Sequence, residues 1–181
     1  MVSKSFGTLI NKDGHGHYTN PNDTKNVVRY VTRTNGMSAD DLIAWGGLGV
    51  LEHSGVESVI DQFYLIQKLH TRRGNFGKYV SHEIFSFSAE GERLISENNL
   101  DIDTIARKMA YDIFEQDHCQ VIYGVHAPNN NEKHLHVHFA INAVNFHTGN
   151  KRRENKTQTH ERDKRFNNII SDEILEKKMR S

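Results

Sequence analysis

Residues 119–144, CQVIYGVHAPNNNEKHLHVHFAINAV, carry the pattern that decides the fold of this chain. Apolar residues alternate with other residue types along 119–126 and again along 135–144, and this period of two predicts a pair of β-strands. The polar loop APNNNEK separates them and predicts that they pair as a hairpin. This stretch therefore predicts two neighbouring antiparallel strands, each with one face directed at a core.

The rest of the 181-residue chain mixes strand and helix patterns in an order typical of an α+β domain. The segment 36–50 contains too many glycines to be assigned. We expect one domain over residues 1–181, built on an antiparallel sheet of about five strands with flanking helices. The expected strands are 3–10, 79–88, 119–126 and 135–144, and the expected helices are 23–34, capped by Asn22 or Asp23, 55–72, 101–116 and a last one from Asp172.

The composition indicates a folded protein without membrane-spanning or secretory segments. Hydrophobic residues make up 36% of the chain and charged residues 25%, with two prolines. No apolar stretch approaches the roughly 20 residues that a spanning helix needs, and the N-terminus lacks a signal peptide. Cys119 is the single cysteine, so an internal disulfide and a cysteine-based zinc site are both excluded. We expect a cytoplasmic location.

Four histidines crowd into the stretch that decides the fold. His136 and His138 lie two apart on one strand, so their side chains share a face, about 6.6 Å apart along the strand. His134 shares that face but would lie about 13 Å from His138. His126 ends the preceding strand, and the hairpin would place it beside the pair. We therefore predict a metal site formed by His126, His136 and His138, with open coordination positions for a phosphate oxygen.

The same stretch resembles the third motif of MobA-type relaxases of the HUH endonuclease superfamily, with His126, His136, His138 and Asn142 at the motif positions. The sequence VVRYV around Tyr30 resembles the early helix that carries the nucleophilic tyrosine of that family. The segment KLHTRRGNFGKYVSHEIFSFSAEGE resembles its second motif. These landmarks follow the order of the family and cover most of residues 24–150.

The resemblance implies an HUH relaxase fold and the N-terminal catalytic domain of a longer protein. It also implies metal-dependent nicking of single-stranded DNA at the transfer origin of a plasmid or integrative element, with Tyr30 joined to the 5′ phosphate. Manganese or magnesium is the implied ion. Accessory relaxosome and coupling proteins are the implied partners. Tyr18 is the main rival nucleophile.

Zero net charge would be unusual for a DNA-binding enzyme, but the charges are segregated along the chain. The candidate phosphate contacts are Arg29, Arg33, Lys68, Arg72, Arg73, Lys78, Arg152 and Arg153. The chain also departs from the family at Pro128, where many relatives carry an acid that orients a histidine or the tyrosine. Glu132 is one candidate replacement for that acid.

Two other functions fit part of the pattern. HLHVHFA alone fits the signature of histidine-triad nucleotide hydrolases, which work without metal, but that function leaves His126 and the helix tyrosine unexplained. A metal-stabilised, non-enzymatic DNA-binding module would bind DNA without forming a covalent adduct. Metal chelation separates the relaxase from the hydrolase, because the hydrolase should be indifferent to it.

Overall fold

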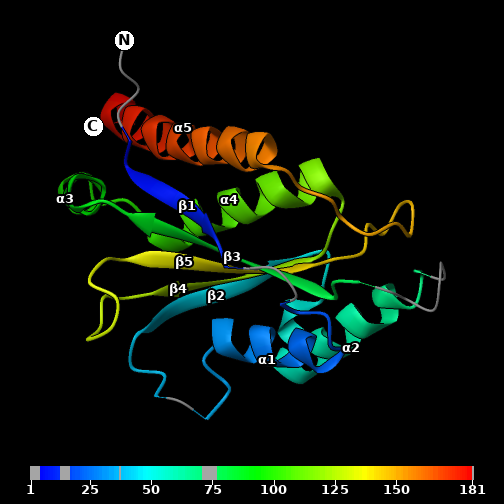
Figure 1. Cartoon of the computed structure of the whole chain (residues 1–181). Coiled ribbons are helices and arrows are strands. Elements are labelled where there is room, and N and C mark those ends of the chain that lie inside the picture. Colours follow the sequence, from blue (N-terminus) through cyan, green and yellow to red (C-terminus); the bar gives the residue numbers. More distant parts are fainter. Residues whose placement is uncertain (1–4, 13–16, 37, 71–76, 181) are drawn as a thin grey trace.

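A computed structural model describes residues 5–12, 17–36, 38–70 and 77–180. Its centre is one antiparallel sheet with the strand order β1-β3-β5-β4-β2 (Figure 1). The strands are β1 (Gly7–Asn11), β2 (Leu42–Leu48), β3 (Val80–Phe87), β4 (Val121–His126) and β5 (His136–Asn142). The predicted α+β fold with an antiparallel sheet of about five strands is confirmed.

Helices cover both faces of the sheet (Figure 1). The helices α4 (Ile102–Asp117) and α5 (Lys156–Arg180) pack on one face, and α1 (Asn22–Val31) and α2 (Val56–Gln67) pack on the other. The short α3 (Ala89–Glu97) directly follows β3, and the 3-10 turn η1 (Glu52–Ser54) precedes α2. Among the described residues, no helix is long and apolar enough to span a membrane.

The alternation along β5 sorts its side chains between the two helical layers. Val137, Phe139 and Ile141 are fully buried in the core under α4 and α5. His136 and His138 therefore lie on the opposite face, beneath α1, as the period of two predicts. The histidine pair thus stands on a rigid central strand rather than on a loop.

The segment that the sequence left unassigned contains the edge strand β2. Its glycines meet a packing requirement: a Cβ added at Gly46 would lie 2.6 Å from the hydroxyl of Tyr123 and 2.8 Å from the guanidinium of Arg107. A larger residue would force these side chains away. Glycine is present here because side chains from other elements crowd the position. A scale of local strand propensity cannot predict this.

The helix predictions differ from the structure at several boundaries. α1 ends at Val31 rather than 34, and its N-cap is Pro21 without a side-chain cap. α5 begins at Lys156, well before Asp172. Its buried residues recur every four positions, and the first of them is the charged Arg162, followed by Phe166, Ile170 and Ile174. The sequence therefore shows little apolar periodicity in the first half of this highly charged helix. The helix α3 was not predicted; Ser88 caps it by accepting a hydrogen bond from the amide of Gly91.

A buried ion cluster joins β3 to the segment around α5. Glu83 is fully buried and accepts hydrogen bonds from Arg152 at 3.0 Å and from Arg162 at 2.9 Å. Asp117 accepts from the same two arginines, at 2.6 and 2.8 Å. Burial opposes the charge of Glu83, but the two guanidinium groups outweigh it and hold its pKa at about 2. Glu154 completes the cluster.

Glu83→Gln should destabilise the protein by about 3 kcal/mol, because it leaves buried guanidinium charge with less compensation. Urea denaturation monitored by circular dichroism measures this loss. Glu90→Gln is the matched control: it removes an exposed partner of Arg93, and it should leave the unfolding free energy nearly unchanged. Equal effects of the two substitutions would contradict a stabilising role for the buried cluster.

Candidate active site

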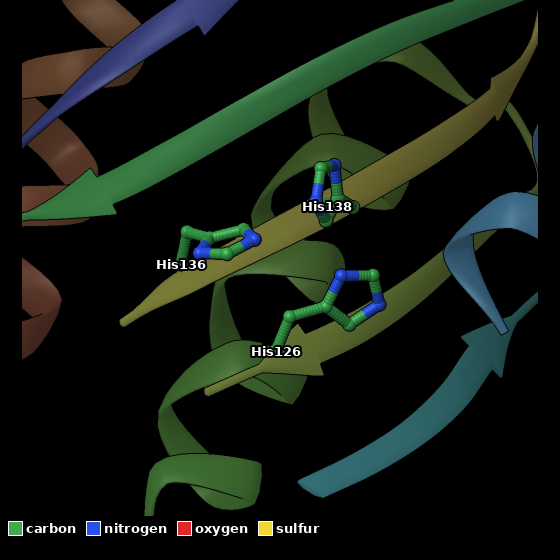
Figure 2. A group of neighbouring side chains, drawn as sticks. All are labelled: His126, His136 and His138. Carbon is green, nitrogen blue, oxygen red and sulfur yellow. The ribbon is translucent and has the colours of Figure 1, made fainter. Parts of the chain in front are cut away.

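Three histidines come together because β4 and β5 are antiparallel neighbours. His126 pairs directly with His136, and His138 pairs with Gly124. Figure 2 shows the three rings gathered over the same side of the two strands. One ring nitrogen of each histidine lies within 4.8 Å of those of the others, and all three side chains are buried. The structure thus brings together His126, His136 and His138.

The hydrogen bonds of these rings leave one nitrogen of each without a partner. Nε2 of His126 donates to the carbonyl of Val31 at 2.8 Å, and Nδ1 of His136 donates to the carbonyl of His134 at 2.7 Å. Nδ1 of His138 lies 3.0 Å from Nε2 of His82. The remaining nitrogens, Nδ1 of His126 and Nε2 of His136 and His138, are buried without a hydrogen bond.

This arrangement fits a divalent metal ion. A neutral imidazole that donates through one nitrogen presents a lone pair at the other, so three lone pairs can converge in this buried site. Leaving buried polar atoms unpaired is costly, and metal coordination would remove that cost. The histidine cluster can therefore hold a metal with three imidazole ligands.

The buried surroundings keep two of the three histidines, His126 and His138, uncharged. Burial lowers the pKa of His126 to about 4, with the nearby Arg33 and His136 contributing in the same direction. Burial also lowers the pKa of His138 far below the usual range, reinforced by the neighbouring histidines. Neutral imidazole is the metal-binding form, so neither ring has to lose a proton near neutral pH before it can bind an ion.

Glu132 supplies a carboxylate beside the cluster. Its Oε2 lies 2.7 Å from Nε2 of His136, an ion-pair distance without the alignment of a hydrogen bond. The loop holds Glu132 in place through Asn129, whose side-chain oxygen accepts from the Glu132 amide at 2.9 Å. Glu132 therefore contacts one of the three histidines but does not belong to the group whose nitrogens converge.

Tyr30 lies on the last turn of α1, above the histidines. Its ring stands edge-on to the ring of His138, with centroids 5.3 Å apart, and lies 6.4 Å from that of His126. The tyrosine is partly exposed and lines a cavity of about 260 Å³. Tyr18, Asn26, Val27 and His82 line the same cavity. Tyr30 thus borders both this cavity and the buried histidine cluster.

Gly124 sets how closely α1 approaches the sheet. A Cβ added there would overlap the carbonyl oxygen of Val31 and lie 3.0 Å from its carbonyl carbon. That same carbonyl accepts the hydrogen bond from His126. The absence of a side chain at Gly124 therefore allows the helix end that carries Tyr30 to rest directly against the cluster.

Gly124→Ala should weaken metal binding by about tenfold or more, because moving the Val31 carbonyl removes the hydrogen bond that orients His126. It should also destabilise the fold by about 1–3 kcal/mol through overpacking. Isothermal titration with Mn²⁺ and thermal denaturation measure the two effects. Gly36→Ala is the control: its backbone φ of 84° makes alanine unfavourable, but the added methyl meets no described atom within 4 Å. Unchanged metal affinity in Gly124→Ala would contradict this role.

Arg33 places a fixed positive charge against Tyr30. Its Cζ lies 4.8 Å from the centroid of the tyrosine ring. Its Nε and one terminal nitrogen each donate to Asp41 at 2.8 Å, whereas the other terminal nitrogen is buried without a hydrogen bond. The hydrogen bond from Arg33 lowers the pKa of Asp41 to about 2. Asn129 also donates to Asp41, so the pair is tied to the loop after His126.

The other predicted phosphate contacts lie at different places in the structure. Arg29 pairs with the exposed carboxylate of Glu57 on α2, and Lys68 is exposed just after that helix. Arg153 is exposed before α5. Arg152 is poorly placed for the predicted phosphate contact, because only 6% of its side chain is exposed and its guanidinium group forms ion pairs with Glu83 and Asp117. Lys78 is partly exposed beside β3, and Arg72 and Arg73 lie outside the described residues.

Sequence reasoning missed His82 as part of the site. It lies on β3, buried, with one ring nitrogen toward His138 and the other 3.3 Å from the hydroxyl of Tyr18. The alternation along 79–88 indicates that His82 shares a face with Val80 and Ile84. It does not indicate which strand pairs with β3, so the contact with His138 could not be predicted.

Comparisons with known proteins give one family match and one similar fold. A family model described as relaxase, MobA/VirD2-like, nuclease domain matches residues 30–177. Among solved structures, one titled conjugative relaxase TrwC in complex with oriT DNA, metal-bound, is similar in fold, with a TM-score of 0.52. It shares 14% sequence identity, and the match covers 96% of this chain and 70% of that one. A search of curated protein sequences finds no significant match.

Proposed function

Because this chain belongs to the family of MobA/VirD2-like relaxase nuclease domains, we propose that it nicks one strand of a transfer origin through a 5′-phosphotyrosyl intermediate. One observation carries the proposal: three buried histidine nitrogens without hydrogen bonds converge, and the Tyr30 ring lies 5.3 Å from that of His138. The similar relaxase of known structure was solved with metal and origin DNA, which supports the same substrate and cofactor classes here.

His126, His136 and His138 would hold the ion, which we propose to be Mn²⁺ or Mg²⁺. When bound, the ion withdraws charge from a phosphate oxygen and favours the phenolate form of a nearby tyrosine. Neutral imidazoles add no negative charge, so they leave the full divalent charge for the phosphate. The histidines themselves only bind and orient; the chemistry on the DNA is assigned to Tyr30.

Tyr30 is the proposed nucleophile. Its oxygen forms a bond to the phosphorus while the bond from phosphorus to the 3′ oxygen breaks. One phosphodiester is exchanged for another, and the proton given up by the phenol is balanced by the proton taken up by the leaving 3′ oxygen, which becomes a 3′ hydroxyl. The energy of the bond is conserved, so the strand can be rejoined. Arg33, which contacts the ring of Tyr30, would stabilise the phosphate charge through its unpartnered nitrogen.

The geometry favours Tyr30 over Tyr18. The ring of Tyr30 packs against both His138 and His126. The ring of Tyr18 packs against His82, with centroids 6.3 Å apart, so His82 separates it from the cluster. A phosphate held beside the three histidines would be within reach only of a phenol that stands next to them. We therefore assign Tyr18 to the wall of the cavity.

A doubly labelled oligonucleotide tests the proposed function. Single-stranded DNA spanning the origin, with different fluorophores at its two ends, is incubated with the protein and Mn²⁺ and run on a denaturing gel. The 3′ label should migrate with the protein, and the 5′ label should appear on a shortened, free strand. EDTA should abolish both signals. DNA that is retarded on a parallel native gel but gives no adduct on the denaturing gel would instead indicate a binding module. Hydrolysis of a nucleotide substrate that resists EDTA, measured in a separate assay, would indicate a histidine-triad enzyme.

A further inference from the structure

The three histidines of the cluster differ in what holds their second ring nitrogen. Those of His126 and His136 donate to backbone carbonyls. That of His138 faces an imidazole instead, Nε2 of His82 at 3.0 Å, and the two rings lie edge to edge with centroids 5.2 Å apart and planes inclined by 29°. A carbonyl can only accept a hydrogen bond, whereas an imidazole nitrogen accepts or donates according to its tautomer. The orientation of His138 therefore depends on the protonation pattern of His82.

We propose that His82 is a positioning residue that locks His138 in its metal-binding tautomer and sets the direction of a hydrogen-bond chain that reaches Tyr18. This inference rests on the metal site of the proposed function. His82 is only 7% exposed and lies on β3, the strand that pairs with β5. It therefore acts from a rigid neighbouring strand rather than from a mobile loop.

The direction of the chain follows from the lone pair of His138. To offer its Nε2 lone pair to an ion, neutral His138 must carry its proton on Nδ1. That proton is donated to Nε2 of His82, so the single proton of neutral His82 is on Nδ1. Nδ1 of His82 lies 3.3 Å from the Tyr18 hydroxyl and donates to its oxygen. Metal binding at His138 thus selects one arrangement of both imidazole protons.

This direction has a consequence for the two tyrosines of the cavity. His82 cannot take the phenol proton of Tyr18, because the nitrogen that faces Tyr18 already carries a proton. To act as a base there, His82 would have to give up the hydrogen bond that orients His138. Tyr18 therefore accepts the hydrogen bond from His82, and this histidine does not activate it as a nucleophile.

Imidazole NMR of the Zn²⁺-loaded protein tests the direction without any substitution. Zinc is diamagnetic and binds the same kind of histidine ligand. Long-range ¹H–¹⁵N correlation spectra should show both His82 and His138 protonated on Nδ1. His82 protonated on Nε2, or on both nitrogens, would overturn the proposal.

Two substitutions of His82 test its effect on the metal. His82→Phe keeps a ring but cannot accept a hydrogen bond, and it should weaken Mn²⁺ affinity by about 10–100-fold in isothermal titration. His82→Gln offers a carbonyl that can accept from His138, so its affinity should stay close to that of the parent protein. Tyr18→Phe is the matched control further along the chain and should leave affinity unchanged. Thermal denaturation of the metal-free variants establishes that each is folded.

The outcomes separate this inference from the proposed function. Equal affinity in His82→Phe and the parent protein would overturn the role of His82, provided that His126→Ala still loses the metal. Equal losses in His82→Phe and His82→Gln would also overturn it, since hydrogen-bond acceptance would then be irrelevant. If the parent protein binds no Mn²⁺, the metal site of the proposed function fails instead.

Discussion

Tyr30→Phe should abolish the covalent DNA adduct and lower strand cleavage by at least about 10³-fold. The substitution removes only the oxygen that the proposal assigns to the attack on phosphorus. The ring packs against His126 and His138, so phenylalanine preserves those contacts. The denaturing-gel assay with the 3′-labelled oligonucleotide measures the adduct, and a titration with Mn²⁺ should give unchanged metal affinity. Loss of cleavage with intact metal binding would distinguish a missing nucleophile from a damaged site.

Tyr18→Phe is the control for this prediction, since both tyrosines line the same cavity. It should retain the adduct, with at most a modest change in rate. An adduct that survives in Tyr30→Phe and disappears in Tyr18→Phe would move the nucleophile to Tyr18. The relaxase chemistry would then stand, but the assignment of the two tyrosines would be wrong.

His138→Ala should weaken Mn²⁺ binding by more than about 100-fold, a larger loss than removal of an orienting partner produces. Its Nε2 is one of the three converging nitrogens without hydrogen bonds, and its ring is the one packed closest to Tyr30. A ligand at 100 times its Kd stabilises the folded state by about 2.7 kcal/mol. Saturating Mn²⁺ should therefore raise the melting temperature of the parent protein but not that of His138→Ala. DNA cleavage should be lost together with this shift.

His134→Ala provides the matched control. His134 belongs to the same sequence cluster, but its side chain is 46% exposed and lies 3.4 Å from Glu92, away from the converging nitrogens. Its removal should leave the Mn²⁺-induced rise in melting temperature intact. A metal response that depends on His134 and persists without His138 would show that the ligand set is wrong.

The central hairpin shows how far local patterns reach. Alternation is a property of a single strand, so the sequence was enough to predict that Val137 and Phe139 face the core and that His136 and His138 share the other face. The hairpin connection between neighbouring segments then predicted that His126 would lie beside them. All three inferences need only a period of two and a short loop.

The helices and charges show where local patterns fail. The long helix α5 is mostly polar, and the few apolar residues that it buries can be recognised only when the helix is seen packed on the sheet. The sequence suggests that Arg152 is a surface cation, but its side chain is buried and forms an ion pair with Glu83. The glycines of β2 also depend on tertiary contacts, because large side chains from distant parts of the sequence leave no room for a Cβ there.

The sequence by itself determined the strand hairpin, its three histidines and the helix that carries Tyr30, because these depend on residues close together in the chain. Only the tertiary structure decided that β3 lies beside β5, bringing His82 to His138, and that α1 rests on Gly124, bringing Tyr30 and Arg33 to the cluster. These contacts join segments tens of residues apart. They are set by strand order and by the packing of a helix on a sheet, which no local periodicity encodes.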